Sequence, residues 1–341
     1  MAKVAHMEYL EDFTAAGLAR IAGRSLLLEL DPVVQGAPVE WARNNAVAID
    51  RLVGENGALL IRGLGIADSE TLDGIFSMLF KNEQLDYVYR STPRTKLQNK
   101  LYTASEYHPG ETILLHNENS YTNRWPLRIA FCCIKPPAQG GQTPIADSRD
   151  VFRSMPADIV ETFDHKGLMY VRNYGSIDLP WSEVFQTTDR KAAESYCAQN
   201  DIEVEWLPNN GLRTRQFTPG LQKHPVTSEP VWFNSAHMFH VSSLREDVHK
   251  AMVSLVGEEN LPRNVYYGDG SRIPNEVFDR IRAAYLKNKM LFDWQPGDLL
   301  ILDNMLFAHG REPFVGDRRV LVGMARGMSG AHFKAGAPLP A

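Results

Sequence analysis

Hydrophobic positions recur along the chain at two spacings, and each spacing predicts a different kind of element. Apolar residues every three to four positions predict amphipathic helices over residues 39–52, 69–80 and 275–289, together with a more polar helix over 189–200. Ser69 stands at the start of the second of these runs and is expected to cap that helix. A further helical stretch at 147–164 is expected to be interrupted near Pro156, because proline disrupts a helix from within.

Shorter apolar runs bounded by turn residues predict strands. They lie at 58–63, 112–115, 128–134, 297–304 and 319–324. Strands towards both ends, with a helical and irregular middle, favour an α+β fold that is mainly β, namely a double-stranded β-helix (jelly roll) with flanking helices. We expect one domain over 1–330 with an insertion or lid at about 150–290, and a loose tail rich in Ala, Gly and Pro at 331–341.

Composition and charge narrow the classes of partner. The 341-residue chain carries a formal net charge of −5, whereas a nucleic-acid-binding surface needs a concentrated basic face. No apolar run is long enough to span a membrane, and the first residues lack the apolar segment of a signal peptide, so we expect a cytoplasmic protein. Cys132, Cys133 and Cys197 are odd in number and match no zinc spacing, which predicts reduced thiols.

The candidate chemistry begins with the triplet His116-Asn117-Glu118 and a distant histidine, His309. Residues i and i+2 of an extended segment point the same way, so His116 and Glu118 can reach one metal ion while Asn117 faces away. Two imidazoles and one carboxylate hold an octahedral Fe(II) on one face and leave the remaining positions open for other ligands. A His-x-Glu triplet is by itself a weak signal, because such a pair is more often part of a solvated loop.

Further segments in a fixed order strengthen this signal. They are Gly140-Gly141-Gln142-Thr143, Trp294-Gln295-Pro296-Gly297-Asp298, Asp303-Asn304, His309-Gly310-Arg311-Glu312-Pro313-Phe314 and Arg318-Arg319. Together with the triplet, they resemble the taurine dioxygenase (TauD/TfdA) family of Fe(II)/2-oxoglutarate oxygenases, over about residues 55–328. The text around the triplet and Trp232-Phe233-Asn234 looks closest to the branch that contains the syringomycin aspartyl hydroxylase.

The resemblance implies a complete cofactor site. His116, Glu118 and His309 would bind the iron, and Thr143 would hydrogen-bond the cosubstrate 2-oxoglutarate. Arg319 would hold the distal carboxylate of 2-oxoglutarate by two charge-assisted hydrogen bonds, with Arg318 as its competitor. Alternation favours Arg319: if the valines at 320 and 322 pack on the outer face of the closing strand, Arg319 points inward.

The substrate is less well defined by the sequence. Taurine dioxygenase places a sulfonate-binding arginine four residues beyond its 2-oxoglutarate arginine, and the corresponding residue here is Gly323, so taurine is not expected. Candidates for substrate contacts are Tyr121, Phe185, Arg213, Arg215, Asn234 and His237. For the aromatic residues, packing in the core is the alternative. For His237 and His240, a core or substrate-lining role is preferred over a second metal site.

The resemblance implies an oxygenase that consumes O₂ and 2-oxoglutarate. The leading hypothesis is hydroxylation of an unactivated C–H bond in an amino acid or amino-acid-derived natural-product unit, either free or tethered to a carrier protein. Alternatives are the same chemistry on a free small organic acid in catabolism, desaturation or cyclisation, and a non-catalytic jelly-roll binding protein. Glu118 occupies the position that halogenating relatives leave for chloride, which favours oxygen transfer. Neither a nucleic acid nor a membrane is expected as a partner, and self-association is left open.

Overall fold

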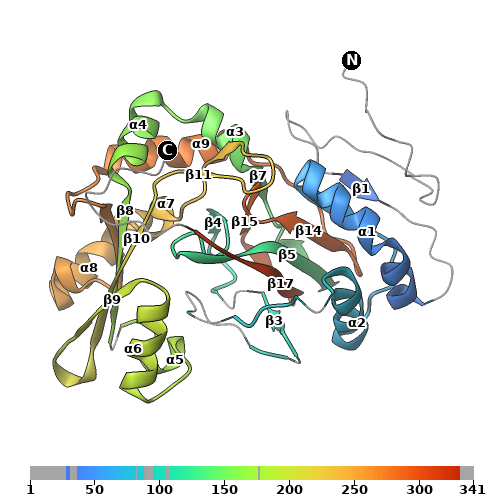
Figure 1. Ribbon diagram of the computed structural model, residues 1–341, viewed down its shortest axis with the longest axis horizontal. Coiled ribbons are helices and arrows are strands. Elements are labelled where there is room, and N and C mark those ends of the chain that lie inside the picture. Colours follow the sequence, from blue (N-terminus) through green and yellow to red (C-terminus); the bar gives the residue numbers. More distant parts are fainter. Residues whose placement is uncertain are drawn as a thin grey trace.

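Two sheets form the jelly roll in this computed structural model, which describes residues 28–30, 37–81, 83–87, 89, 95–97, 99–104, 107–175 and 177–330 (Figure 1). The larger sheet has the strand order β1 (Leu28–Leu30), β2 (Ala58–Ile61), β14 (Leu299–Asp303), β5 (Arg124–Lys135), β17 (Arg319–Ser329) and β3 (Leu101–Thr103). The smaller sheet has the order β4 (Ile113–His116), β15 (Phe307–Arg311) and β7 (Ile145–Asp147). The first and last thirds of the described chain therefore meet in one α+β jelly roll, as the strand pattern predicted.

The larger sheet is buried on both faces. Helices α1 (Pro38–Asn56) and α2 (Ser69–Leu79) cover one face, where Phe76 packs with Leu299 and Leu321. The other face, with Phe131, Leu300 and Val322, forms the interior of the jelly roll. Because alternate side chains of a strand point to opposite faces, strands buried on both sides are apolar at nearly every position, as β14 is.

The predicted cap of α2 is wrong by one residue. The carboxylate of Asp68, not the hydroxyl of Ser69, accepts a hydrogen bond from the backbone N–H of Thr71 at 2.7 Å. Aspartate and serine are both good N-cap residues, so composition alone does not separate neighbouring candidates.

The segment between β7 and β14 forms a third sheet and a set of helices. Its four-stranded sheet has the order β13 (Arg263–Tyr267), β8 (Leu168–Tyr174), β10 (Leu212–Thr218) and β9 (Ile202–Trp206). The helices are α3 (Ser148–Ser154), α4 (Ala157–Lys166), α5 (Trp181–Val184), α6 (Arg190–Gln199), α7 (Ala236–Phe239), α8 (Glu246–Val256) and α9 (Asn275–Lys287). The helix break expected near Pro156 separates α3 from α4. Two short strand pairs, β6 (Gln139–Gly140) with β16 (Phe314–Val315) and β11 (Gln222–Lys223) with β12 (Pro230–Val231), complete the sheets.

Three other expectations concern the cysteines, a membrane span and the tail. All three cysteines are free and buried, and burial raises the pKa of the Cys133 and Cys197 thiols to about 12, which keeps them protonated and unreactive. Among the helices of the described residues, none combines the length and apolar character needed to cross a bilayer. The tail predicted at 331–341 lies outside the described residues.

Gly323 marks the closest approach of α2 to β17. A Cβ atom at this position would overlap the ring of Phe76. We expect Gly323→Ala to lower the free energy of unfolding by about 1–3 kcal/mol, since overpacking a tight core forces side chains from their rotamers. Urea denaturation measures this loss, and Gly175→Ala, whose new methyl group would meet no described atom within 4 Å, should change it by less than about 0.5 kcal/mol. Equal stability of the two variants would contradict the packing of α2 against β17.

Candidate active site

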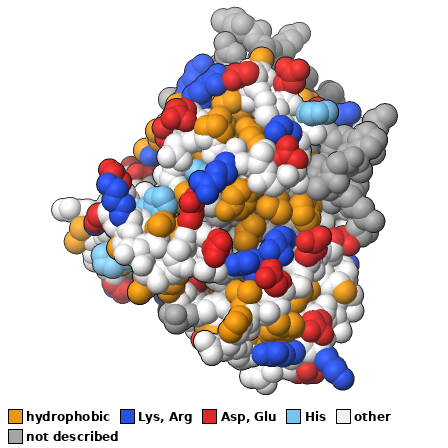
Figure 2. Space-filling view, turned by 90° about the vertical axis from the view of Figure 1, so that its left-hand side faces the viewer, with side chains coloured by type: hydrophobic (Ala, Val, Ile, Leu, Met, Phe, Trp, Pro, Cys, Tyr) orange, Lys and Arg blue, Asp and Glu red, His pale blue; other side chains and the backbone are white. Residues whose placement is uncertain are grey.

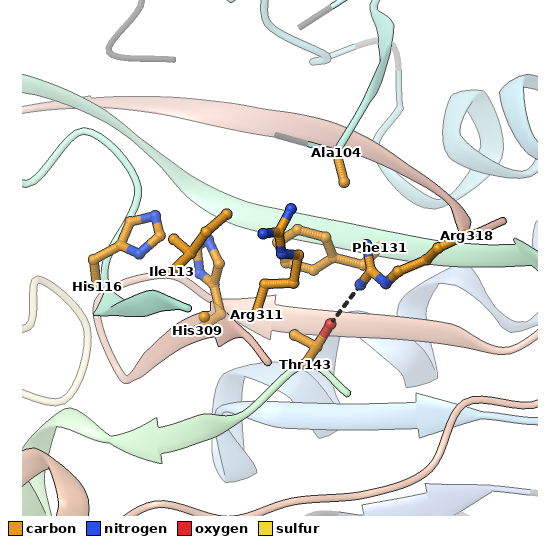
Figure 3. A pocket seen from close by; sticks show the side chains of 9 residues that line it. Ala104, Ile113, His116, Phe131, Thr143, His309, Arg311 and Arg318 are labelled. Atoms are coloured by element: carbon orange, nitrogen blue, oxygen red, sulfur yellow. Dashed lines mark hydrogen bonds between the residues drawn. The ribbon is translucent and has the colours of Figure 1, made fainter. Parts of the chain in front are cut away.

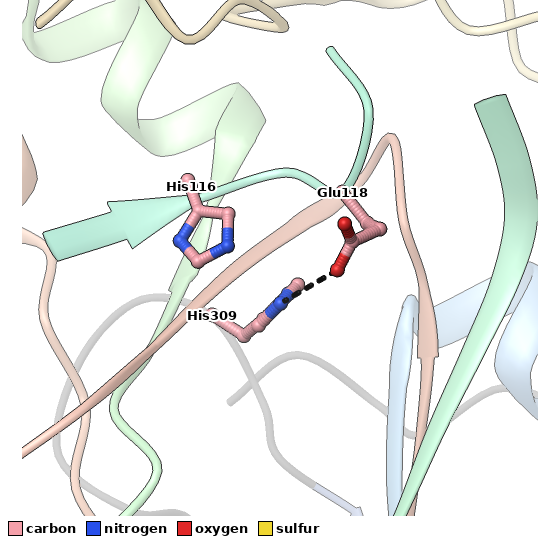
Figure 4. A group of neighbouring side chains, drawn as sticks. All are labelled: His116, Glu118 and His309. Atoms are coloured by element: carbon pink, nitrogen blue, oxygen red, sulfur yellow. Dashed lines mark ion pairs between the residues drawn. The ribbon is translucent and has the colours of Figure 1, made fainter. Parts of the chain in front are cut away.

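The jelly roll brings His116, Glu118 and His309 together. His116 ends β4, Glu118 lies in the turn that follows, and His309 lies opposite His116 on the neighbouring strand β15. One ligand atom from each residue lies within 4.8 Å of the others (Figure 4). The Glu118 carboxylate oxygen is 4.0 Å from Nε2 of His309, and the two imidazole centroids are 4.6 Å apart. The grouping predicted from the sequence is therefore present.

The orientation of His116 suits a metal ligand. Its Nδ1 lies 2.8 Å from the carbonyl oxygen of Leu114, so a proton on Nδ1 is donated to that carbonyl and the lone pair of Nε2 faces the other two ligands. Glu118 and His309 are only 2% and 3% exposed. A buried carboxylate beside two imidazoles is stabilised by a divalent cation, and two nitrogens with one oxygen are a donor set that fits Fe(II).

Asn304 links the two segments that carry the ligands. Its side-chain oxygen accepts the backbone N–H of Glu118 at 2.7 Å, and its amide nitrogen donates to the carbonyls of Glu118 and Pro126, both at 2.9 Å. The side chain of Asn117 turns away from the ligands and donates to the carbonyl of Asn304 at 2.7 Å and to Ser148 Oγ at 3.1 Å. Both asparagines therefore position ligands rather than bind metal.

Asp303 holds the turn between β14 and β15. Its fully buried carboxylate accepts the backbone N–H groups of Met305 and Leu306 at 3.0 and 3.1 Å. The same carboxylate pairs with Arg128 and lies 3.2 Å from Nε2 of His224. Because a carboxylate with several donors is strongly oriented, the turn enters β15, and therefore His309, in a fixed geometry.

A narrow pocket begins at the histidines and ends at Arg318 (Figure 3). Its lining residues are Ala104, Ile113, His116, Phe131, Thr143, His309, Gly310, Arg311 and Arg318. At the far end, Thr143 Oγ1 lies 3.4 Å from a guanidinium nitrogen of Arg318 and accepts the indole N–H of Trp294 at 3.1 Å. Burial lowers the pKa of Arg318 to about 10, so the guanidinium stays charged at neutral pH. This end of the pocket is therefore cationic.

The predicted orientation of the two arginines is wrong. Arg319 is exposed, whereas Arg318 lines the pocket and donates from Nε to the carbonyl of Gly141 at 3.0 Å. The alternation was assigned to the wrong face, because Val320 and Val322 belong to the interior of the jelly roll. The other face of β17 packs against α2, so both faces are apolar and the sequence pattern does not distinguish them.

Arg311 is engaged by the segment that leads into β4. Its guanidinium donates to the carbonyls of Tyr107, His108 and Glu111 at 2.6–2.8 Å. Arg311 also lines the pocket beside Gly310. It therefore braces the chain before His116.

The polar residues expected to contact substrate form contacts within the protein. Arg213 donates to the side-chain oxygens of Asn173 and Asn260 at 2.7 and 2.8 Å, and Arg215 pairs with Glu205 at 2.7 Å. The side chain of Asn234 donates to the carbonyl of Gly220 at 2.9 Å and accepts the backbone N–H of Ala236 at 3.1 Å. These contacts hold β10 and the start of α7 and lie outside the lining of the pocket at the histidines.

His237, Tyr121 and Phe185 occupy core positions. Nε2 of His237 lies 2.8 Å from the carbonyl of Leu115, and burial lowers the His237 pKa to about 3, which keeps the ring neutral. The Tyr121 hydroxyl donates to the carbonyl of Tyr89 at 2.9 Å, and Phe185 packs against the Tyr89 ring at a centroid distance of 5.5 Å. All three side chains are buried, as the alternative of core packing predicted, and their contact with substrate stays a prediction.

The fold and the site define an Fe(II)/2-oxoglutarate-dependent dioxygenase. The family model described as "Taurine catabolism dioxygenase TauD, TfdA family" matches residues 29–325, and the chain belongs to this family. The family, the jelly-roll fold, and iron with 2-oxoglutarate as cofactors were all expected from the sequence, and these expectations are confirmed.

Two curated proteins and one solved structure show similarity along most of the chain. The dapdiamide synthesis protein DdaC of Enterobacter agglomerans is 42% identical over 277 residues, which cover 81% of this chain and 84% of DdaC. A clavaminate synthase-like protein of Arabidopsis thaliana is 29% identical over 290 residues, covering 82% of this chain and 84% of that protein. The crystal structure of PvcB from Pseudomonas aeruginosa matches with a TM-score of 0.52 and 17% identity, covering 91% of this chain and 87% of PvcB. The PvcB match supports the fold.

Removal of the Asn304 side chain tests whether this contact assembles the metal ligands. We expect Asn304→Ala to weaken Fe(II) binding roughly 10–100-fold, since residues that orient ligands affect metal affinity by this amount. It should also lower the free energy of unfolding by about 2–4 kcal/mol, because buried partners lose their hydrogen bonds. Anaerobic metal titration and urea denaturation measure the two effects.

Asn234→Ala is the matched control, because Asn234 is equally buried and hydrogen-bonded to the backbone but lies outside the pocket at the histidines. It should reduce stability and leave metal affinity unchanged. Unaltered Fe(II) affinity in folded Asn304→Ala would exclude the positioning role.

Proposed function

We propose that His116, Glu118 and His309 bind Fe(II) and that the enzyme hydroxylates a C–H bond of an amino acid or amino-acid-derived natural-product unit. The grouping of these three ligand atoms within 4.8 Å is the observation that carries the proposal. In the balanced reaction, substrate C–H, 2-oxoglutarate and O₂ give substrate C–OH, succinate and CO₂. One oxygen atom enters the product and the other enters succinate.

We propose that Arg318 and Thr143 bind the distal carboxylate of 2-oxoglutarate. The cationic end of the pocket lies opposite the metal ligands, and Thr143 and Arg318 converge there (Figure 3). A guanidinium forms strong directional hydrogen bonds with a carboxylate. Bound iron with 2-oxoglutarate and O₂ supplies the oxidising power, while the chain orients the cosubstrate and encloses the reacting atoms in apolar walls such as Phe131.

The substrate class is supported by sequence similarity. DdaC, whose name assigns it to dapdiamide synthesis, and the resemblance to the syringomycin hydroxylase branch both favour natural-product biosynthesis. With Arg318 as the 2-oxoglutarate residue, the residue four positions further on is Val322, which is fully buried and apolar. Val322 cannot bind a sulfonate, so this register also disfavours taurine. A carrier-tethered form of the substrate remains an alternative to the free form.

The two neighbouring arginines provide a matched test of the cosubstrate site. We expect Arg318→Gln to raise KM for 2-oxoglutarate by about 30-fold or more, because losing charge-assisted hydrogen bonds costs about 2 kcal/mol or more. Arg319→Gln removes the same charge from an exposed side chain and should leave KM unchanged. Succinate formation at varied 2-oxoglutarate measures both, and the reverse pattern would assign the role to Arg319.

The fate of the oxygen atoms distinguishes hydroxylation from its alternatives. With Glu118 as an iron ligand, we expect the product to gain one oxygen atom derived from isotopically labelled O₂, also in the presence of chloride. Mass spectrometry of the product measures this. A chlorinated product, or one that loses two hydrogens without gaining oxygen, would contradict hydroxylation.

A further inference from the structure

A larger cavity adjoins the metal-ligand strand. It has a volume of about 320 Å³, compared with about 30 Å³ for the pocket at the histidines. Ile113 lines both spaces. Leu114, two residues before His116 in β4, lines the larger one. Ligand pockets for small molecules usually have about 300–1,000 Å³, so the larger cavity is of a size that suits a small-molecule substrate.

A second contact ties this cavity to the ligands. Phe239 forms part of its wall and packs against the ring of Tyr121 at a centroid distance of 4.7 Å. Tyr121 lies three residues after Glu118. The cavity therefore borders the ligand segment directly through Ile113 and Leu114, before His116, and is linked to the segment after Glu118 through the contact of Phe239 with Tyr121.

The walls of the cavity are mainly apolar and partly formed by α8. They include Met238, Phe239, Leu244, Met252, Leu261 and Pro262. Helix α8, which carries Met252, has no buried residue, and Leu244 beside it and Ile177 across the cavity are exposed. Figure 2 shows the face that includes α8, where hydrophobic side chains gather between acidic and basic ones. An apolar side chain would therefore be recognised here, with an opening at the surface.

One ion pair, Asp178 with Arg263, interrupts these walls. Nε of Arg263 lies 3.0 Å from one carboxylate oxygen of Asp178, and the side chains are 27% and 19% exposed. Burial alone would raise the pKa of Asp178, but Arg263 beside it holds that pKa below its usual range, so the pair is ionic at neutral pH. His240 also lines the cavity. Burial lowers the pKa of its imidazole to about 4, so the ring is neutral at neutral pH.

We propose that this cavity binds a free α-amino acid with an apolar side chain, with its ammonium group on Asp178, its carboxylate on Arg263 and its side chain towards Ile113. The assignment rests on the proposed function. A fixed carboxylate and guanidinium side by side offer an acceptor and a donor that match the two charges of a zwitterion. The Asp178–Arg263 ion pair and the zwitterion each carry no net charge, so their association buries no net charge. A thioester-tethered amino acid lacks the carboxylate and would lose half of this recognition.

Calorimetry of the protein loaded anaerobically with Fe(II) and 2-oxoglutarate tests the proposal. The probes are free L-amino acids with apolar side chains, their carboxamides, which lack the carboxylate, and their N-acetyl derivatives, which lack the ammonium group. We expect at least one free amino acid to bind and to stimulate succinate release. Its two derivatives should bind at least about tenfold more weakly, the effect of one lost charge-assisted hydrogen bond.

Variants connect this selectivity to the cavity. Arg263→Gln should weaken binding of the amino acid at least about tenfold and abolish the preference over the carboxamide, with 2-oxoglutarate binding unchanged. Met252→Trp places a larger side chain in the cavity from helix α8 without altering the ion pair, and it should also prevent binding of the amino acid. This second variant keeps the proposal testable if Arg263→Gln does not fold. Arg280→Gln, which breaks the exposed pair with Asp158, is the control and should change nothing.

Three results would overturn the proposal. The first is equal binding of the amino acid and its carboxamide, and the second is full binding of the amino acid to Met252→Trp. The third is that no amino acid of the panel binds a protein that does bind Fe(II) and 2-oxoglutarate, which would leave the proposed function intact and remove only the substrate assignment. Failure to bind Fe(II) and 2-oxoglutarate would instead contradict the proposed function itself.

Discussion

The hydrogen bonds of Asn304 are the contact on which the site depends. They join the turn that follows β4 to the turn that precedes β15, although the two partners are 186 residues apart in sequence. The carboxylate of Asp303 fixes the second turn from within, through two backbone N–H groups and the buried Arg128. Because the three proposed metal ligands belong to these two segments, the fold brings them together without a bound cofactor.

The two faces of the larger sheet have different roles. One face packs beneath α1 and α2, and its side chains belong to the hydrophobic core. The opposite face carries Phe131 into the narrow pocket, where apolar walls separate the metal ligands from the cationic end at Arg318. Beyond Ile113, the larger cavity has apolar walls and a single ion pair. Charged side chains therefore lie at the two positions where we propose that a dicarboxylate and a zwitterion bind, and the histidines lie between them.

The sequence predicted the parts of this structure that depend on local pattern or on a distinctive motif. Helical periodicity located α1, α2 and α9, and the motif order brought His116, Glu118 and His309 together. The choice between Arg318 and Arg319 failed because both faces of β17 are covered, so alternation does not identify the inner face. Asp178 and Arg263 were missed because they lie 85 residues apart and meet only through folding of the segment between β7 and β14. The division of the chain into one domain with an insertion remains a prediction.

We propose that one preassembled site holds Fe(II) by three side chains and 2-oxoglutarate by Arg318. A crystal structure of the anaerobic complex with Fe(II) and 2-oxoglutarate tests this proposal. We expect iron bound by His116, Glu118 and His309, with the distal carboxylate of 2-oxoglutarate on Arg318 and Thr143. Iron held by other residues, or a distal carboxylate turned away from Arg318, would contradict it.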